Sequence, residues 1–349
     1  MKNKKKILFF LPSFAGGGAE KVTITFVNNL PINDYDIHLT VLNHYGKLKK
    51  TINSNIVVHD LKVERLRYGL LKIISNINYV KPDIIFSTFI NLNIYLLFCK
   101  FFYKNIKFLI RAESIPSTHF KFLPYSKLYR FLYNFFYIKA DILIASCQLI
   151  YDEFYSIGAN KNNIKLIPNP VENISYATKN NIIRQSGEGI RVVAAGRLSE
   201  QKGYDYLLEI ISKIKSKIHC TILGEGILDK KLKELSFKLN INHIVKFEGY
   251  VDNPYPYLKG ADALLITSNF EGLPNIALEA LYLGTPVIAT PSCGGLKELK
   301  YVTIVDKGDK FINAVENIKI NKNCNKQTLL DKRFNVNNVI RSLIAVLRN

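Results

Sequence analysis

Two glutamates eight positions apart, Glu271 and Glu279, stand on either side of a predicted strand-to-helix turn. The apolar, β-branched run 263–267 predicts a buried parallel strand, and apolar residues at helical spacing follow Pro274 as far as Leu283. We therefore expect Glu271 on the loop at the carboxyl end of a strand and Glu279 about two helical turns further on, facing back along its helix. Ligands of open parallel sheets bind at that edge, where two carboxylates suit the hydroxyls of a ribose and a sugar ring.

Two cations, Arg197 and Lys202, lie five positions apart on the loop that follows the predicted strand 191–195. A guanidinium binds phosphate oxygens through a planar fork and an ammonium binds them as a point charge, so the pair can straddle a diphosphate. On residue types alone, a pair of exposed surface charges is the other interpretation. A diphosphate neutralised in this way needs no Mg²⁺, and no Asp-x-Asp follows a strand end here. We therefore expect a metal-independent site without a cofactor.

Three consecutive glycines, 16–18, separate the first predicted strand, 6–11, from a predicted helix at about 20–30. Such a loop lets backbone N–H groups approach a ligand closely, and the N-terminus of the following helix favours negative charge. The spacing is not G-x-G-x-x-G, so a dinucleotide site is not indicated. A simple tight turn is the alternative interpretation of these glycines.

Strand-like and helix-like segments alternate along the chain, which predicts βαβ units in an α/β fold with parallel sheets. The polar run 173–189 comes after Pro168-Asn169-Pro170 and indicates a linker. We expect one Rossmann-like domain over 1–172 and a second over 190–330, followed by an amphipathic helix within 331–349. Two such domains enclose a cleft, which is a common place for a ligand.

The string that begins at Glu271, Glu-Gly-Leu-Pro with a trailing Gly-Thr-Pro-Val, resembles the Glu-x₇-Glu signature of the retaining glycosyltransferases of family 4. The string GRLSEQKG around Arg197 resembles the diphosphate-binding loop of that family, and Gly294-Gly295 with Glu298 resembles its Gly-Gly-x-x-Glu element. The matches run from Gly17 to Glu298. The resemblance implies a GT-B fold, in which two Rossmann-like domains face each other across a cleft and the C-terminal helix packs back on the N-terminal domain.

The resemblance also implies roles for individual residues. Arg197, Lys202 and Glu271 would be the catalytic residues, with Glu271 on the sugar hydroxyls. Glu279 would bind the ribose, while the main chain at Tyr250 and Val251 would bracket the nucleobase. The other donor-binding residues implied in this way are Gly17, Gly18, Gly272, Leu273 and Asn275. Asn275 has a second interpretation, as the cap of the helix that starts at Pro274, and we expect that role.

Three residues of the first domain are candidates for the acceptor. Arg111, Glu113 and His119 follow the predicted strand 106–110, and relatives often place an Arg, Glu or His of this loop beside the transferred sugar or the acceptor. A lone surface histidine is the other interpretation of His119. We expect the N-terminal domain to bind the acceptor.

The chain carries a net charge of +20, and its first half is the more basic. Residues 1–185 contain 25 Lys and Arg against 11 Asp and Glu, a net +14, so 186–349 carry the remaining +6. The segment 119–139 interleaves basic with aromatic residues, which is typical of a core helix or of a surface that docks on anionic lipid. No nucleic-acid-binding motif is present, so nucleic acid is not an expected partner.

Location follows from the cysteines and the hydropathy. The five cysteines are scattered singly, which fits a reducing cytoplasm better than a disulfide framework. No apolar stretch is long enough for a membrane span. We therefore expect a cytoplasmic protein with a peripheral contact to the inner face of the membrane.

Taken with the resemblance, these features predict transfer of a hexose or N-acetylhexosamine from a nucleoside diphosphate sugar, most simply UDP-linked. The acceptor would be a saccharide hydroxyl of a lipid-linked glycan, lipopolysaccharide or capsule precursor. A GT-B epimerase or phosphorylase is a rival that lacks the Glu-Gly-Leu-Pro string. A non-catalytic GT-B subunit that binds a sugar nucleotide or a glycan is the second rival, and the retention of Arg197, Lys202, Glu271 and Glu279 argues against it.

Overall fold

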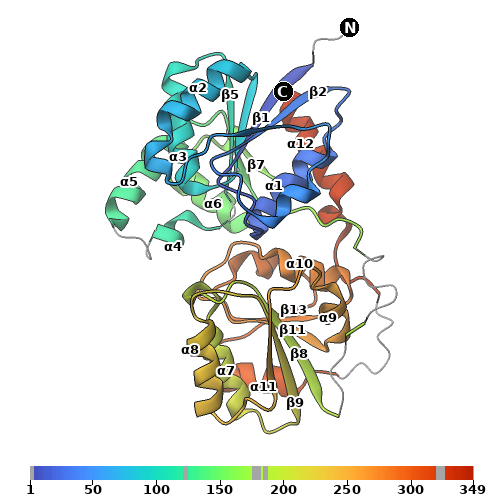
Figure 1. The fold of residues 1–349 in the computed structure, drawn as a ribbon. Helices are drawn as coiled ribbons and strands as arrows, with labels where there is room; N and C mark the ends of the chain where they lie inside the picture. The colour runs from blue at the N-terminus through green and yellow to red at the C-terminus, as the bar shows by residue number, and fades with distance from the viewer. Residues whose placement is uncertain are drawn as a thin grey trace. The chain divides into compact units, whose positions relative to one another are not determined.

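The computed structural model describes residues 4–112, 114–120, 125–174, 182–183, 188–319 and 327–348, and the side chain of His119 is not described. The chain forms two compact units (Figure 1). Unit 1 contains Met1–Pro170 and Val336–Asn349, and unit 2 contains Val171–Asn335. Each unit is built on one parallel sheet and has its own hydrophobic core.

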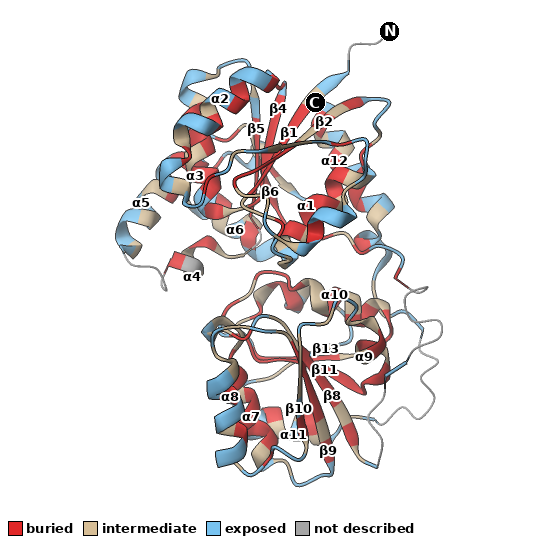
Figure 2. Ribbon diagram, in the orientation of Figure 1, coloured by how far each residue is buried: buried red, intermediate tan, exposed pale blue. Residues whose placement is uncertain are grey.

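Unit 1 has a seven-stranded parallel sheet in the order β3-β2-β1-β4-β5-β6-β7. The run Ile7–Leu11 in β1 is apolar without interruption because helices cover both faces of the sheet, and its side chains are fully buried (Figure 2). The strands are β1 (Lys5–Leu11), β2 (Tyr35–Val41), β3 (Val57–Asp60), β4 (Ile84–Ser87), β5 (Lys107–Ala112), β6 (Ile142–Ala145) and β7 (Ile164–Leu166).

The helices of unit 1 include one from the end of the chain. They are α1 (Gly18–Asn29), α2 (Leu70–Val80), α3 (Ile90–Cys99), α4 (Pro116–Phe120), α5 (Ser126–Tyr137), α6 (Gln148–Ser156) and α12 (Val336–Arg348). The last helix, α12, lies beside α1 and buries Val339, Ile340, Leu343 and Leu347 in the core of unit 1 (Figure 1). These residues recur at helical spacing, so the amphipathic pattern of the sequence is explained by packing on unit 1.

Unit 2 has a six-stranded parallel sheet in the order β10-β9-β8-β11-β12-β13. Its strands are β8 (Ile190–Ala195), β9 (Ile218–Leu223), β10 (Val245–Gly249), β11 (Ala263–Ile266), β12 (Val287–Ala289) and β13 (Val302–Ile304). Its helices are α7 (Tyr204–Lys213), α8 (Asp229–Lys238), α9 (Tyr255–Gly260), α10 (Asn275–Tyr282) and α11 (Asp309–Glu316). The strand order reverses between β8 and β11, and in a sheet of this topology a crevice opens at the carboxyl ends of these two strands.

The two passages of the chain between the units differ slightly from the expected boundaries. The chain enters unit 2 at Val171 and leaves it after Asn335, and these two residues pair in an isolated bridge. The segment 331–335, which was expected to accompany the C-terminal helix, therefore belongs to unit 2. Much of the expected linker, 175–181 and 184–187, lies outside the described residues.

Some elements differ from the sequence-based expectation. The short helices α4 and α9 were not predicted. The pattern of 92–103 predicts one helix, but α3 ends at Cys99 and a 3-10 turn, η3 (Lys100–Phe102), follows. Among the helices that the structure describes, none is long and apolar enough to cross a bilayer. Four of the five cysteines are buried, and the described residues contain no disulfide between them; Cys324 lies outside the described residues.

Candidate functional site

The loops after β8 and β11 form the centre of the site in unit 2. Gly196 follows β8 with φ 152°, and the chain then makes a 3-10 turn, η6 (Glu200–Lys202), before α7 begins. Gly203 caps α7 with φ 60°, and a Cβ added there would lie 2.4 Å from the carbonyl oxygen of Thr267. Only glycine lets the β8 loop approach the end of β11 so closely.

Hydrogen bonds tie the two loops together. The backbone N–H of Asn269 donates to the carbonyl of Gln201 at 2.7 Å, and the Asn269 side-chain amide donates to the carbonyl of Glu200, also at 2.7 Å. The hydroxyl of Thr267 donates to the carbonyl of Gly203 at 3.0 Å. These contacts hold the β8 loop, which carries both predicted cations, against the loop that carries Glu271.

Lys202 and Glu271 meet at this junction, where the ammonium donates to the carboxylate oxygen Oε1 in an ion pair. The Lys202 side chain is 20% exposed and that of Glu271 is 11% exposed. The hydroxyl of Ser268 donates to the same carboxylate oxygen at 3.0 Å. A carboxylate buried this far needs such partners, because loss of water around a charge is costly. The structure thus brings together two of the three predicted catalytic side chains.

The charge of Glu271 also acts on its neighbours. Burial raises the pKa of the Tyr204 phenol, and the negative charge of Glu271 raises that pKa further. Burial likewise raises the pKa of the Cys293 thiol, with Glu271 adding to the increase and Lys202 opposing it. Both groups are therefore neutral, so the ion pair supplies the charge in this part of the site.

Arg197, the third predicted catalytic residue, is on the same loop and is exposed. The next residue, Leu198, is fully buried and its N–H donates to the carbonyl of Glu225 at 2.9 Å. The loop is therefore anchored directly beside Arg197 while the guanidinium is left in solvent. An exposed guanidinium on an anchored loop is suited to bind an anionic ligand.

The Glu-Gly-Leu-Pro turn rests on the loop that follows β12. Glu271 forms a parallel bridge with Cys293, and its N–H donates to the carbonyl of Ser292 at 3.2 Å. The N–H of Gly295 donates to the carbonyl of Gly272 at 3.0 Å, and both glycines are buried. The Gly294-Gly295 element therefore supports the turn that carries Glu271.

The helix after the turn, α10, places Glu279 but corrects the role of Asn275. Asn275 is the first helical residue and Pro274 is the N-cap, without a side-chain capping bond, so the prediction that Asn275 caps this helix is wrong. The proline explains the difference, since its fixed φ suits the start of a helix and moves the cap one residue earlier. Leu273 is buried, and Glu279 is half-buried in the second turn of α10. The ribose contact of Glu279 stays a prediction.

The loops after β9 and β10 complete this edge of unit 2. A Cβ at Gly224, where φ is 135°, would lie 2.0 Å from the carbonyl oxygen of Gly196. The carboxylate of Glu225 accepts from the N–H of Tyr250 at 3.3 Å, which fixes the start of the β10 loop. Tyr250 is partly exposed and Val251 is half-buried, and their nucleobase contacts stay predictions. Sequence reasoning gave Glu225 no role, although the glycines on both sides of it were the available signal.

One of the two predicted glycines of unit 1, Gly17, lies against a carboxylate. Gly17 is the N-cap of α1, and Gly18 is its first residue. A Cβ at Gly17 would lie 2.4 Å from Oε2 of Glu20, so this buried side chain folds back over the glycine loop. The contact of Gly17 and Gly18 with a donor phosphate stays a prediction.

Arg111 differs from its prediction. It lies inside β5, not on the loop after it, and its side chain is only 1% exposed. Its guanidinium donates to the side-chain oxygen of Asn169 and lies over the ring of Phe26, 5.7 Å from the centroid. In this position Arg111 braces the core of unit 1, and its contact with an acceptor stays a prediction. Glu113 and the side chain of His119 lie outside the described residues, so their acceptor contacts stay predictions.

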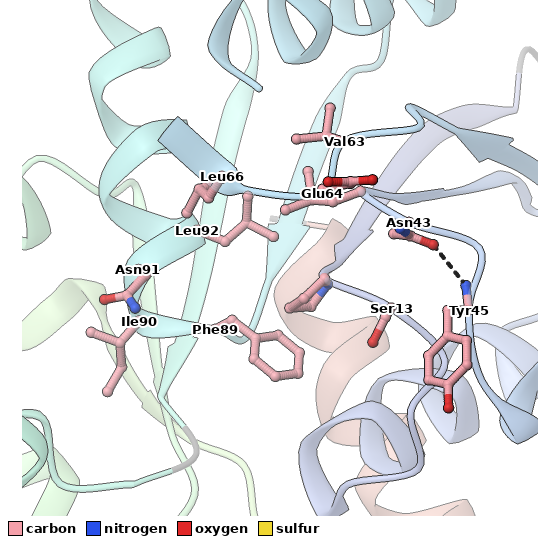
Figure 3. A pocket seen from close by; sticks show the side chains of 12 residues that line it. Ser13, Asn43, Tyr45, Val63, Glu64, Leu66, Phe89, Ile90, Asn91 and Leu92 are labelled. Carbon is pink, nitrogen blue, oxygen red and sulfur yellow. Dashed lines mark hydrogen bonds between the residues drawn. The ribbon is translucent and has the colours of Figure 1, made fainter. Parts of the chain in front are cut away.

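Sequence reasoning missed a cavity of about 560 Å³ in unit 1. It lies where β1 and β2 end and α3 begins, and Figure 3 shows Ser13, Asn43, Glu64 and the ring of Tyr45 around it. The side chain of Asn43 accepts from the N–H of Tyr45 at 3.1 Å, which orders the loop at its edge. A cavity of this size at the carboxyl edge of a parallel sheet can hold a small ligand.

The described residues contain no group of three or more His, Cys, Asp or Glu side chains placed to hold a metal ion. The metal-independent site stays a prediction, since the sequence argument for it rests on the two cations and not on this observation.

The chain matches models of two families of known proteins. Residues 16–173 match the model described as Glycosyltransferase Family 4, and residues 177–325 match the model described as Glycosyl transferases group 1. Together the two matches span most of both units. The chain belongs to glycosyltransferase family 4, which confirms the resemblance drawn from its motifs.

Two relatives illustrate the likeness. The chain is 32% identical to an uncharacterised glycosyltransferase of Methanocaldococcus jannaschii over 269 residues, which are 71% of this chain and 64%, less than two thirds, of that protein. It is 25% identical to the N-acetylgalactosamine-N,N'-diacetylbacillosaminyl-diphospho-undecaprenol 4-alpha-N-acetylgalactosaminyltransferase of Campylobacter jejuni, over 84% of this chain and 83% of that one. Other curated relatives are named as glycosyltransferases of lipopolysaccharide biosynthesis.

Solved structures show the same fold. HepE of Anabaena, crystallised with UDP and glucose, matches with a TM-score of 0.77 at 18% identity and 99% coverage of both chains. The apo form of WaaB, a lipopolysaccharide outer core galactosyltransferase, matches with a TM-score of 0.72 at 18% identity, over 98% of this chain and 99% of that one. The two Rossmann-like units therefore make a GT-B glycosyltransferase fold, as predicted.

Proposed function

We propose that this glycosyltransferase moves a hexose or N-acetylhexosamine from a nucleoside diphosphate sugar, with UDP as the nucleotide, to a saccharide hydroxyl. The acceptor is a lipid-linked glycan or a precursor of lipopolysaccharide or capsule. The names of the relatives support this choice, since the Campylobacter jejuni enzyme is named for a diphospho-undecaprenol-linked saccharide and the Anabaena structure holds UDP and glucose.

The observation that carries the proposal is the position of Lys202 and Glu271 at the switch point of the unit 2 sheet. A lysine ammonium has three N–H donors, so Lys202 can keep Glu271 and still reach a phosphate oxygen. Arg197 is on the same anchored loop and supplies a second cation. One site thus offers positive charge for a diphosphate and a carboxylate for sugar hydroxyls.

The proposed mechanism uses this charge in the transition state. As the glycosidic bond breaks, positive charge develops on the sugar ring and negative charge on the departing diphosphate. Arg197 and Lys202 stabilise that negative charge, an effect worth about 2.7–4 kcal/mol per well-placed donor in other enzymes. Glu271 orients the sugar through its hydroxyls, and Glu279 binds the ribose. These two cations do the work that Mg²⁺ would otherwise do, so the proposed reaction needs no metal.

Configuration is retained in the proposed reaction. The acceptor hydroxyl attacks on the face that the diphosphate leaves, and the departing phosphate oxygen takes its proton. In this scheme no side chain has to act as nucleophile or general base. The proposal therefore requires only that the cations of unit 2 hold the diphosphate close to the sugar while the acceptor enters.

We assign the acceptor to unit 1. Its cavity offers Ser13, Asn43 and Glu64, whose oxygens can bind saccharide hydroxyls, beside the ring of Tyr45 (Figure 3). Apolar surface with a few convergent polar groups is typical of small-molecule sites. A lipid-linked acceptor places the proposed reaction at the inner face of the cytoplasmic membrane. Nucleic acid has no role in this scheme.

The test is a panel of UDP-, GDP- and ADP-sugars incubated with the full chain in the presence of EDTA. We expect slow hydrolysis of one UDP-sugar, with the sugar released first as the anomer of the donor, as followed by NMR. Loss of hydrolysis in EDTA, with recovery on adding Mg²⁺, would contradict the metal-independent mechanism. Release of the opposite anomer would contradict retention. A folded protein that binds a donor and never turns it over would favour a non-catalytic binding subunit.

A further inference from the structure

The outward face of α5 is apolar where a helix facing water normally carries charge. Four large apolar side chains recur there at spacings of three and four residues, and all are exposed: Leu128, Phe131, Phe135 and Ile138. That spacing puts them on one stripe of the helix. A different face of α5, with Tyr133, Phe136 and Tyr137, is buried against unit 1. Core packing therefore does not account for the outward stripe.

The stripe continues onto a second element. Phe101 and Phe102 of η3 are both exposed, although they are far from α5 in the sequence. The ring of Phe136 joins the two elements, with its centroid 6.2 Å from that of Phe101 and 6.3 Å from that of Phe98. Helices α3 and α5 lie side by side at this edge of unit 1, and the ribbon of α5 carries residues coloured as exposed in Figure 2. We call the six exposed side chains, Phe101, Phe102, Leu128, Phe131, Phe135 and Ile138, the aromatic patch.

The charged side chains around the aromatic patch are mostly basic. Between Asp83 and Asp141 the sequence has eight Lys and Arg residues and a single acidic one, Glu113. Lys127 and Arg130 are exposed on α5 beside the stripe, and Lys139 lies over the ring of Phe135, 6.0 Å from its centroid. Lysine and arginine side chains can lay their apolar stems along such a surface while their charges reach outward.

We propose that the aromatic patch and its basic border are a docking surface for a membrane rich in anionic lipid. Large exposed apolar patches mark surfaces that bind proteins or membranes. The basic border decides between these, because aromatic side chains enter the boundary between headgroups and acyl chains while Lys and Arg pair with anionic headgroups. Unit 1 would thus be the part of the enzyme held at the lipid surface.

This inference rests on the proposed function in one respect, since a lipid-linked acceptor is the reason for unit 1 to lie at a membrane. The sequence analysis singled out 119–139 as a basic and aromatic segment, but the contribution of η3 is visible only in the structure. The patch also differs from the cavity of unit 1 and from the site of unit 2, as it shares no residue with either.

The experiment is co-sedimentation of the full chain with vesicles of phosphatidylcholine alone and with vesicles in which part of it is replaced by phosphatidylglycerol. We expect binding to the anionic vesicles that weakens as salt is added. Replacing Lys127 and Arg130 by glutamine should weaken binding by about fivefold for each charge removed. The variant with Phe101→Ser and Phe131→Ser should lose most of the binding that remains at high salt.

Matched controls come from α8 in unit 2. Phe237 is 66% exposed there, compared with 64% for Phe131, so Phe237→Ser makes the same chemical change outside the patch. Lys230→Gln with Lys231→Gln removes two exposed charges from the same helix. Both control variants should bind vesicles as the wild type does. Equal losses in the patch and control variants would overturn the proposal, because binding would then follow overall charge or hydrophobicity.

Other outcomes also decide the question. Failure of the wild type to bind either kind of vesicle would overturn the proposal. A second contradicting outcome is a wild type that binds no vesicles but forms a dimer in light scattering. If that dimer disappears in the variant with Phe101→Ser and Phe131→Ser, the patch binds a second copy of the chain. Donor hydrolysis in solution, measured on the same variants, should be unchanged. That readout separates failure of the docking surface from failure of the proposed function.

Discussion

Lys202 and Glu271, 69 residues apart in the sequence, form a largely buried ion pair at the carboxyl edge of the unit 2 sheet. The pair exists because the β8 loop is hydrogen-bonded to the loop after β11 through Asn269 and Thr267. The hydroxyl of Ser268 adds a second partner to the carboxylate. One cation and one carboxylate of the proposed site are therefore positioned before any ligand arrives, which reduces the cost of ordering them on binding.

The ion pair should contribute to the free energy of unfolding of unit 2. Lys202→Met leaves the Glu271 carboxylate largely buried without its cation and should lower the free energy of unfolding of unit 2 by about 2–3 kcal/mol. Adding Glu271→Leu should recover part of that loss, because no charge is then left unpaired. Urea unfolding of the two single variants and the double variant measures the coupling. Losses that simply add in the double variant would show that the two side chains do not stabilise each other.

The close approach of the β8 and β9 loops makes Gly224 sensitive to an added methyl group. Gly224→Ala should lower the free energy of unfolding by more than about 3 kcal/mol, from the backbone strain and the 2.0 Å contact with Gly196 together. Gly308 is the matched control, since its φ is also positive but nothing lies within 4 Å of its added Cβ. Gly308→Ala should cost only about 1 kcal/mol, the strain alone. Equal losses in the two variants would contradict the packing argument.

Glu153 on α6 should make stability depend on pH. Burial raises the pKa of this carboxyl above its ordinary value of 4.5, although hydrogen bonds from the N–H and the hydroxyl of Ser117 oppose the increase. The folded state therefore holds the proton to higher pH than the unfolded state does. Stability then falls as the pH rises from 4.5 through the pKa of the folded state.

Glu153→Gln tests this dependence, because glutamine does not titrate and its oxygen can still accept from Ser117. Relative to the wild type, the variant should gain stability as the pH rises through that window. Urea unfolding of both proteins across the acidic range gives the difference at each pH. A difference that stays constant would show that the carboxyl has the same pKa in both states.

The helix α12 should stabilise unit 1 and not unit 2. Leu343 is 1% exposed in the core of unit 1, so Leu343→Ala should cost about 2–5 kcal/mol of its unfolding free energy. The neighbouring Ser342 is exposed, and Ser342→Ala serves as the control. Hydrogen exchange resolves the two units separately and should show faster exchange in unit 1 alone. Loss of hydrogen-exchange protection in unit 2 would contradict the claim that α12 stabilises unit 1 alone.

Much of the fold follows from local pattern. Uninterrupted apolar runs such as 84–87 and 263–266 are strands because a parallel sheet is covered on both faces, so every predicted strand appears within a few residues of its expected place. The helix α4 escaped prediction because five residues carry too little periodic signal. Similarly, α9 spans six residues and includes Pro256, which argues against a helix in a sequence read by itself.

Less of the candidate site could be predicted, because local sequence pattern does not show which distant residues come into contact. The strings around Arg197 and Glu271 located the two loops, but the pairing of Lys202 with Glu271 depends on β8 and β11 being neighbours at the switch point. Arg111 shows the opposite error, since an arginine reads as exposed until its partner Asn169, 58 residues away, is seen. The cavity of unit 1 combines four separate segments and has no sequence signal of its own.

The most direct test of the account is donor binding and hydrolysis by Lys202→Ala, compared with Lys230→Ala on the exposed face of α8. Calorimetry with the UDP-sugar that the wild type hydrolyses, without added metal, gives the affinity, and NMR gives the rate. We expect Lys230→Ala to behave as the wild type and Lys202→Ala to lose about 10²–10³ in rate, because one stabilising cation is missing from the transition state. Wild-type binding and hydrolysis by Lys202→Ala would contradict the assignment of this loop to the donor diphosphate.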